Sequence, residues 1–244
     1  MKLNTEGIVI RENETGENDR VVTLLTKDAG VIRAFVRGAK TVRNRNMSGT
    51  QLFGYSRLSV YRGRDAYTVD DAQPIEVFFK LRENIEYLSL AQYFCELFAF
   101  FAPTEESADD YLSLLLNALY LLSNGKRPQP LIKAVTELRV LCLSGYMPDI
   151  VACGECGKFS DETMYFDCEN GKLFCSECKG SGRAINMGVV TALRYICYSE
   201  PKKIFNFTLS DEGLKKLSEL TETYMKVHAQ RGFKTLDFYK SLLP

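Results

Sequence analysis

The sequence predicts an α+β protein, with a small N-terminal β-barrel followed by an α-helical bundle that carries a cysteine-rich insertion. Five segments with strand patterning lie within about the first 75 residues, and helical periodicity begins at Leu81. Two C-x-x-C pairs interrupt the helical pattern after residue 150. We therefore predict a barrel domain at 1–80, a helical domain formed by 81–150 and 183–244, and a cysteine module at 151–182.

The predicted barrel strands are short and rich in β-branched and aromatic residues. Turn residues separate them, among them Gly16, Gly30 and Gly63. Five short antiparallel strands in this length predict an OB-fold, with an SH3-like barrel as the alternative. The strands are expected at residues 3–11, 20–26, 31–36, 55–61 and 66–70.

A basic segment in this barrel is the candidate nucleic-acid-binding surface. Residues 33–64 contain eight Arg or Lys residues and no Asp or Glu, with aromatic residues interleaved. Cations that follow a phosphate backbone and rings that stack on bases are typical of single-strand binding. The alternative is an ordinary charged surface with its aromatics in the core, where Phe35 and Phe53 are each expected. The candidate residues are Arg33, Arg37, Lys40, Arg43, Arg45, Arg57, Arg62 and Arg64.

The helical segments carry wide apolar faces, which predict that they pack together in a bundle. Pro103 is expected to end the first helix, and Ser210 to cap the fifth. A wide apolar stripe could also leave a groove for a partner's hydrophobic tail, although packing in the core explains most of these residues. The helices are expected at residues 81–101, 109–122, 130–144, 187–198, 214–229 and 235–243.

The cysteine module has the spacing of a metal site. Cys153 and Cys156 form one pair, Cys175 and Cys178 the other, and 18 residues separate the pairs. This spacing is typical of a tetrahedral zinc site in a zinc-ribbon-like module, and four thiolates leave no open position, so the zinc is expected to be structural. Redox-active or disulfide pairs and an iron–sulfur cluster are the alternatives. Asn170-Gly171 predicts a hairpin between the pairs. The remaining thiols, Cys95, Cys142, Cys168 and Cys197, are expected to fill the core.

Charge and composition narrow the functional classes. The net charge is zero, but residues 1–80 carry 13 basic and 10 acidic residues and residues 183–244 carry 10 and 6, which favours a polyanionic partner for the two ends. The chain shows no membrane-length apolar run and no signal-peptide pattern, so a cytoplasmic protein is expected. It has a single histidine, His228, expected at the surface, and no phosphate-binding glycine loop, so an enzyme is not favoured.

The order of these parts resembles the bacterial RecO family of recombination mediators. The similarity lies in short motifs whose order and spacing match to about residue 180. After the basic loop, residues 41–46 depart from the family, whose members usually carry more Ser and Lys there. The matching motifs are Gly7-Ile8-Val9-Ile10-Arg11, Glu17 with Arg20, Thr26-Lys27-Asp28-Ala29-Gly30, Arg37-Gly38-Ala39-Lys40, Glu96-Leu97, Glu137-Leu138-Arg139-Val140-Leu141, Gly145-Tyr146-Met147-Pro148-Asp149 and Cys153-x-x-Cys156-Gly157.

The resemblance implies an OB-fold that binds single- and double-stranded DNA, anneals complementary strands and works with RecR. It also implies binding of the C-terminal tail of single-strand-binding protein, indirect action on RecA, and a nucleoid-associated place in the cytoplasm. No catalysis is implied. An acidic tail needs an apolar slot with a cation at its edge, for which Lys133 and Arg139 are the candidates. The competing hypotheses are a zinc-ribbon scaffold without DNA contact and an enzyme.

Overall fold

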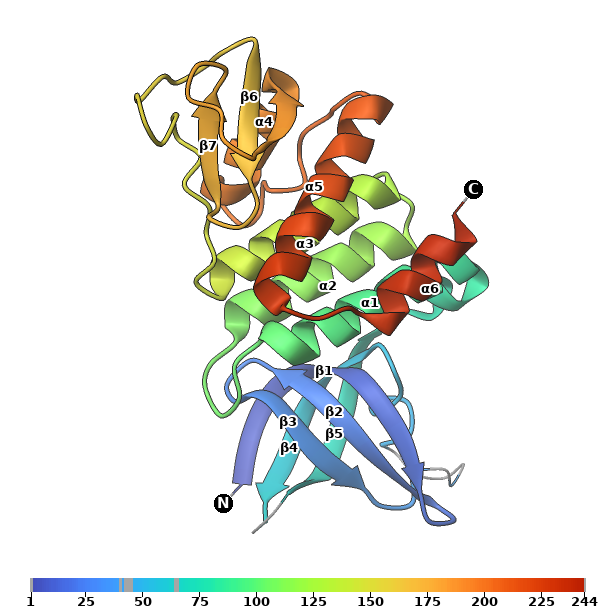
Figure 1. Cartoon of the computed structure of the whole chain (residues 1–244). Helices are drawn as coiled ribbons and strands as arrows, with labels where there is room; N and C mark the ends of the chain where they lie inside the picture. Colours follow the sequence, from blue (N-terminus) through green and yellow to red (C-terminus); the bar gives the residue numbers. More distant parts are fainter. Residues whose placement is uncertain (1, 40, 42–45, 64–65, 244) are drawn as a thin grey trace. The chain divides into compact units, whose positions relative to one another are not determined.

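The computed structural model describes residues 2–39, 41, 46–63 and 66–243. Its contacts divide the chain into two compact units, residues 1–124 with 233–244, and residues 125–232. The first unit contains a five-stranded barrel and three α-helices, and the second contains a three-stranded sheet and three α-helices (Figure 1). The domain boundaries predicted from the sequence, at residues 80, 150 and 182, remain a prediction.

The barrel closes in the strand order β1-β2-β3-β5-β4. Four of its five strand pairs are antiparallel, and β3 pairs with β5 in parallel. This order confirms the predicted OB-fold. The strands are β1 (Lys2–Thr15), β2 (Asp19–Thr26), β3 (Gly30–Val36), β4 (Gly54–Arg62) and β5 (Tyr67–Val77).

Alternation along the strands decides which side chains fill the barrel. On β3, Ile32, Ala34 and Val36 are buried in the core, so the residues between them point outward. The register of β1 against β2 shifts between Val9 and Arg11, and the extra residue, Ile10, is buried. This β-bulge restarts the alternation, so Arg11 is exposed and pairs with Thr23.

The helices of the first unit are fixed by caps and by aromatic packing. The Asn84 side chain accepts hydrogen bonds from the backbone of Glu86 and Tyr87, so α1 begins at Ile85 and not at residue 81 as predicted. A separate 3-10 turn, η1 (Phe79–Glu83), precedes it. The Tyr93 ring on α1 packs edge-on against Phe233 beside α6. The α-helices here are α1 (Ile85–Phe101), α2 (Asp109–Ser123) and α6 (Lys234–Leu242).

In the second unit, helices pack beside a small antiparallel sheet with the order β7-β6-β8. Ser210 caps α5 through the backbone of Gly213, as predicted. The predicted hairpin is also present, with Gly171 at a φ of +64° directly before β7. The elements are α3 (Gln129–Leu143), β6 (Thr163–Asp167), β7 (Lys172–Cys175), β8 (Arg183–Asn186), α4 (Met187–Tyr198) and α5 (Asp211–Ala229).

His228 is partly exposed at the surface, as predicted, but its ring is also engaged in packing. Its ring packs against Tyr146 and Tyr224, with centroid distances of 4.9 and 4.4 Å. Burial lowers the pKa of the imidazole below its usual value. The histidine therefore packs on two tyrosine rings while part of it stays exposed to solvent.

No helix within the described part of the chain has the length and apolar character needed to cross a membrane.

Candidate nucleic-acid interface and metal centre

One outer face of the barrel brings two arginines and an aromatic ring together. Arg11 on β1, Thr23 on β2 and Arg33 on β3 are cross-strand partners in one row, so their side chains share the outer face. In the next row, Val21 of β2 faces Phe35 of β3. Adjacent strands lie about 4.8 Å apart, which places the two arginines of the first row about 10 Å apart across the face.

Phe35 lies on this face and not in the core, which corrects the prediction for it. Its side chain is 44% exposed, whereas Phe53 is fully buried as predicted. Arg33 and Phe35 are two residues apart on one strand and therefore point the same way. The alternation of Ile32, Ala34 and Val36 was the signal in the sequence that could have placed Phe35 outside. Arg11, which is also exposed here, was not among the candidate residues.

Arg33 on this face is less compensated than the two described arginines of β4. Arg33 makes no ion pair with any residue that the structure describes. Arg37 follows β3 and is exposed. The predicted residues Lys40, Arg43, Arg45 and Arg64 lie outside the described residues.

Two other candidate arginines lie on β4, each beside an acidic residue. Arg62 Nη2 lies 2.6 Å from Glu105 Oε1, and Arg57 Nε lies 3.7 Å from Glu6 Oε1. The structure therefore divides the described part of the basic segment between the outer face of β3 and strand β4. Pairing with carboxylates makes the β4 arginines weaker candidates for phosphate contacts than Arg33.

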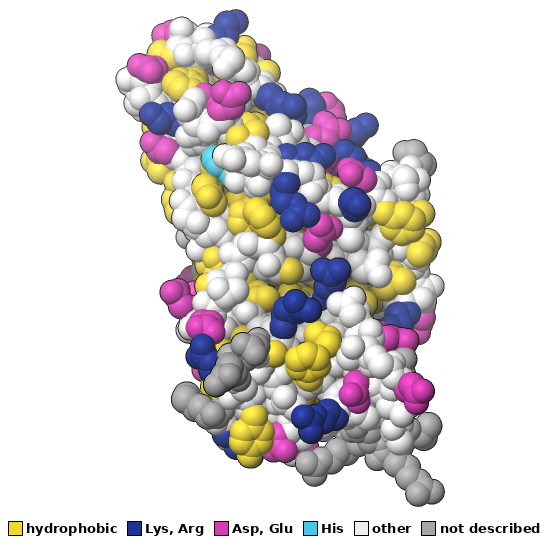
Figure 2. Space-filling model, turned by 60° about the horizontal axis from the view of Figure 1, so that its bottom comes forward, with side chains coloured by type: hydrophobic (Ala, Val, Ile, Leu, Met, Phe, Trp, Pro, Cys, Tyr) yellow, Lys and Arg dark blue, Asp and Glu magenta, His cyan; other side chains and the backbone are white. Residues whose placement is uncertain are grey.

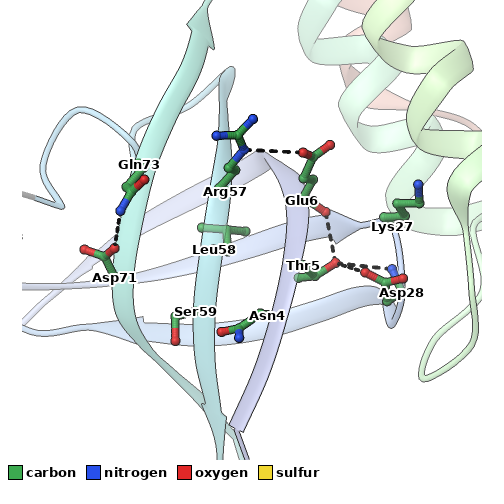
Figure 3. Close-up of a pocket in the computed structure, with 10 residues that line it drawn as sticks. All are labelled: Asn4, Thr5, Glu6, Lys27, Asp28, Arg57, Leu58, Ser59, Asp71 and Gln73. Carbon is green, nitrogen blue, oxygen red and sulfur yellow. Dashed lines mark hydrogen bonds and ion pairs between the residues drawn. The ribbon is translucent and has the colours of Figure 1, made fainter.

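The β4 face contains a polar hollow of about 560 Å³ (Figure 3). Glu6, Asp28 and Asp71 line it together with Lys27 and Arg57. Three carboxylates against two cations give the hollow a negative excess, which repels a phosphate backbone. On the face in Figure 2, acidic and basic side chains are likewise interspersed.

The acids of this hollow are also held by neighbouring hydroxyls. The Tyr55 hydroxyl donates to Glu6 at 2.6 Å, and the Thr5 hydroxyl donates to Asp28 at 2.6 Å. Burial of the phenol and its hydrogen bond to Glu6 raise the pKa of Tyr55 to about 12. Glu6 and Asp28 are therefore held by hydrogen bonds within the barrel itself, which accounts for their place in the hollow.

The four predicted cysteine ligands converge in the second unit. The Sγ atoms of Cys153, Cys156, Cys175 and Cys178 all lie within 4.8 Å of one another. A tetrahedral ion with metal–sulfur bonds of about 2.3 Å sets its sulfurs about 3.8 Å apart. The Cys156 and Cys175 sulfurs are 3.6 Å apart, so the donor set fits one metal ion. Cys168 is partly buried and does not belong to this group.

The backbone around these thiols is preorganised for a metal. Gly157 takes a φ of +74° and donates its N–H to the Cys153 carbonyl at 3.0 Å, which folds the first turn back over its sulfurs. The N–H of Gly154 donates to the carbonyl of Leu173 at 2.8 Å and ties that turn to β7. Burial raises the pKa of Cys153, but backbone N–H groups near its sulfur outweigh it and lower the pKa to about 6.

Asp161 connects the two cysteine turns. The backbone N–H and the hydroxyl of Ser176 both donate to its carboxylate, at 3.0 and 2.6 Å, and Lys158 lies 3.3 Å away. The Ser176 hydroxyl makes the largest contribution to holding the pKa of Asp161 below its usual range. The carboxylate thus stays ionised and links the turn of Cys175 to the segment after Cys156.

The candidates for binding a partner's tail are engaged inside the second unit. Lys133 is only 3% exposed, and its Nζ lies 3.0 Å from carboxylate oxygens of both Glu137 and Glu222. Arg139 Nη1 donates to the carbonyl of Cys197 at 2.8 Å and to that of Ile196 at 3.3 Å, at the end of α4. The prediction that Lys133 is an exposed cation at the edge of a groove was therefore wrong. Its side chain is buried, and two carboxylates neutralise its charge.

Comparison with known proteins identifies the family of the chain. A family model described as Recombination protein O N terminal matches residues 1–78, and one described as Recombination protein O C terminal matches residues 82–237. A DNA repair protein RecO of Acetivibrio thermocellus is 35% identical over 243 residues, covering 98% of this chain and 97% of the relative. Relatives of the same name are 29% identical in Alkaliphilus metalliredigens (99% and 100% covered) and 30% identical in Dehalococcoides mccartyi (98% and 96% covered). Together with the closed barrel and the gathered cysteines, these matches show that the chain belongs to the RecO family.

Proposed function

We propose that this chain is a DNA-binding mediator of recombinational repair that has no catalytic activity of its own. Its family membership supports a role in DNA repair and recombination. The observation that supports direct DNA binding is the outer face of β1, β2 and β3, where Arg11 and Arg33 lie in one row beside the exposed ring of Phe35.

The chemistry of this face fits a single strand. Guanidinium groups bind phosphates without reading sequence, and an exposed ring stacks on any base. Phe35 and Arg33 stand on one strand, so one nucleotide can stack while a neighbouring phosphate is neutralised. Duplex DNA exposes phosphates but hides its base faces, so the arginines serve both DNA forms and the ring serves the single strand.

Fluorescence anisotropy with a labelled oligo-dT and a labelled duplex, each over a salt series, tests this function. We expect Phe35→Ala to weaken oligo-dT binding roughly 5- to 150-fold, because stacking contributes about 1–3 kcal/mol per base, and to leave duplex binding almost unchanged. Arg33→Ala is expected to reduce the logarithmic salt slope on oligo-dT by about 0.7, the value for one phosphate contact.

Arg62→Ala is the matched control, since it removes an arginine of the same barrel that is paired with Glu105. We expect its DNA affinity to stay within about twofold of the wild type. Equal losses in Arg33→Ala and Arg62→Ala would place DNA elsewhere on the barrel. A wild type that binds neither DNA at low salt would refute the proposal and favour a zinc-ribbon scaffold without DNA contact.

We also propose that the protein anneals complementary strands and assists RecA loading together with RecR and single-strand-binding protein. This function would place it in the cytoplasm, at the nucleoid. The surface that binds the protein tail is not assigned to Lys133, whose charge is already neutralised. Annealing of complementary oligonucleotides coated with single-strand-binding protein tests this activity, and loss of annealing in Phe35→Ala would connect it to the barrel face.

We propose that the metal is a structural zinc ion held by Cys153, Cys156, Cys175 and Cys178. Four thiolates are a ligand set that zinc prefers, and a closed tetrahedron leaves no position for a substrate. Zinc would therefore supply folding free energy to this module and no reaction chemistry. Elemental analysis of the purified protein is expected to find one zinc ion per chain, and iron in its place would refute the assignment.

A further inference from the structure

Two cysteines outside the metal centre lie side by side in the second unit. Cys142 is in the last turn of α3 and Cys197 is in the last turn of α4. Their Sγ atoms are 3.8 Å apart. A disulfide has a sulfur–sulfur distance of about 2.0 Å, so the two sulfurs need to approach by only about 1.8 Å to form one.

The surroundings of the pair differ between the two thiols. Cys197 is 4% exposed, whereas Cys142 is only partly buried. Arg139 lies one turn before Cys142 and places its guanidinium on the carbonyls of Ile196 and Cys197, so a cation lies beside both sulfurs. A partly exposed thiol near a cation is the setting in which cysteines react.

We propose that Cys142 and Cys197 form a peroxide-oxidisable pair that closes to a disulfide. The structure supports an order of events in which Cys142 reacts first. A hydrogen bond from the Cys197 thiol and the charge of Arg139 lower the pKa of Cys142, and the same hydrogen bond raises the pKa of Cys197 well above its usual range.

The reaction balances with a hydroperoxide as the oxidant. The Cys142 thiolate attacks one peroxide oxygen, the O–O bond breaks, and the products are a sulfenic acid on Cys142 and hydroxide. The Cys197 sulfur then attacks the sulfenic sulfur, the S–O bond breaks, and the departing hydroxide takes up the thiol proton as water. Overall, two thiols and one hydrogen peroxide give one disulfide and two molecules of water.

The position of the pair gives this modification a structural consequence. The whole cysteine module, from Cys153 to Cys178, lies in the chain between Cys142 and Cys197. A disulfide would therefore close a loop around this module and hold the ends of α3 and α4 together. This link does not use the metal ligands, so it stays in place when an oxidant strips the metal from the four thiolates.

Peptide mapping of the metal-loaded, full-length protein tests the proposal. Hydrogen peroxide is added and quenched, the chain is unfolded in chelator with an alkylating agent, and it is then digested with trypsin without reduction. Cleavage after Arg139, Lys158, Arg194 and Lys202 gives peptides 140–158 and 195–202. We expect these two peptides to be joined, with Cys153 and Cys156 both alkylated and a mass two hydrogens below the sum.

Variants separate this pair from general thiol oxidation. Cys142→Ser is expected to abolish the joined peptide, while Cys95→Ser, which removes a thiol buried in the first unit, should keep it. In Cys197→Ser the sulfenic acid has no partner, so labelling of Cys142 by dimedone should rise several-fold above wild type.

Absence of the joined peptide from wild type, or its formation only after Cys153 and Cys156 have been oxidised, would overturn the proposal. So would a Cys197→Ser protein of native circular dichroism whose Cys142 takes up no dimedone.

Discussion

Replacing Lys133 by methionine is a direct test of how the second unit is held together. The lysine joins α3 to α5, because its Nζ contacts Glu137 at 3.0 Å on its own helix and Glu222 at 3.0 Å on the other. Glu137 is fully buried, and the Thr221 hydroxyl donates to it at 2.8 Å. Methionine fills a similar volume but removes the charge, so two carboxylates lose a cation inside the protein.

We expect Lys133→Met to lower the free energy of unfolding by about 3–5 kcal/mol, the usual cost of removing one partner of a buried pair. Lys216→Met is the matched control. It removes an i,i+4 pair with Glu212 on α5 in which both side chains are exposed, so we expect the free energy of unfolding to change far less than in Lys133→Met. Urea unfolding followed by circular dichroism measures both variants.

A second substitution tests the electrostatic origin of the loss. Lys133→Met combined with Glu137→Leu removes the most deeply buried carboxylate along with the cation. We expect this double variant to be more stable than Lys133→Met alone, since an apolar replacement of a buried pair often costs little. Equal costs for Lys133→Met and Lys216→Met would refute the reasoning, as would a double variant less stable than the single one.

Three further predictions concern other parts of the chain. Cys175→Ser should lower the zinc content and the Tm together, because a structural zinc ion contributes folding free energy, and a metal-free protein as stable as the loaded one would contradict this. Tyr55 has a raised pKa in the folded protein, so its neutral form stabilises the fold below pH 10, and this contribution is lost as the pH rises toward about 12. Thermal melts should therefore show a steeper fall of the Tm over that pH range for wild type than for Tyr55→Phe. Parallel curves of Tm against pH would contradict this prediction. Gly30→Ala should lower the free energy of unfolding by about 2–5 kcal/mol, since Gly30 has a φ of +61° and a Cβ would meet the Pro103 carbonyl oxygen. Gly16 has a φ of +56° but open space around it, so Gly16→Ala should lower the free energy of unfolding by only about 1–2 kcal/mol. Similar urea midpoints for the two variants would show that the contact with Pro103 is not tight.

The features that could be predicted from the sequence are those set by local chemistry. Four of the five barrel strands were expected within their observed bounds, because β-branched runs end at turn residues such as Gly30. The fifth strand was expected at residues 66–70, but it begins at Tyr67 and continues to Val77. The cap at Ser210 and the hairpin at Gly171 depend on backbone preferences of single residues, and both are confirmed. The gathering of the four cysteine sulfurs follows from spacing alone, since two C-x-x-C turns joined by a hairpin bring them together.

The features that were missed depend on partners distant in the chain. Lys133 reads as a surface lysine, and only the folded unit shows that Glu222 of α5 lies beside it. The start of α1 was placed too early because the apolar spacing continues through η1, while the Asn84 cap defines the real beginning. The bulge at Ile10, which turns Arg11 outward, has no glycine or proline to mark it in the sequence.

The same argument explains why counting charges along the chain gave an incomplete picture of the candidate DNA-binding surface. Residues 33–64 contain no acid, yet Glu6 and Glu105 are brought by the fold to Arg57 and Arg62. The field that a phosphate meets depends on the charges around it in space, so these two arginines contribute less than their number suggests. Conversely, Arg11 lies outside the counted segment and joins the face through its pairing with Thr23. Cross-strand register, and not the length of a basic segment, therefore determines which arginines of this barrel can bind one DNA strand together.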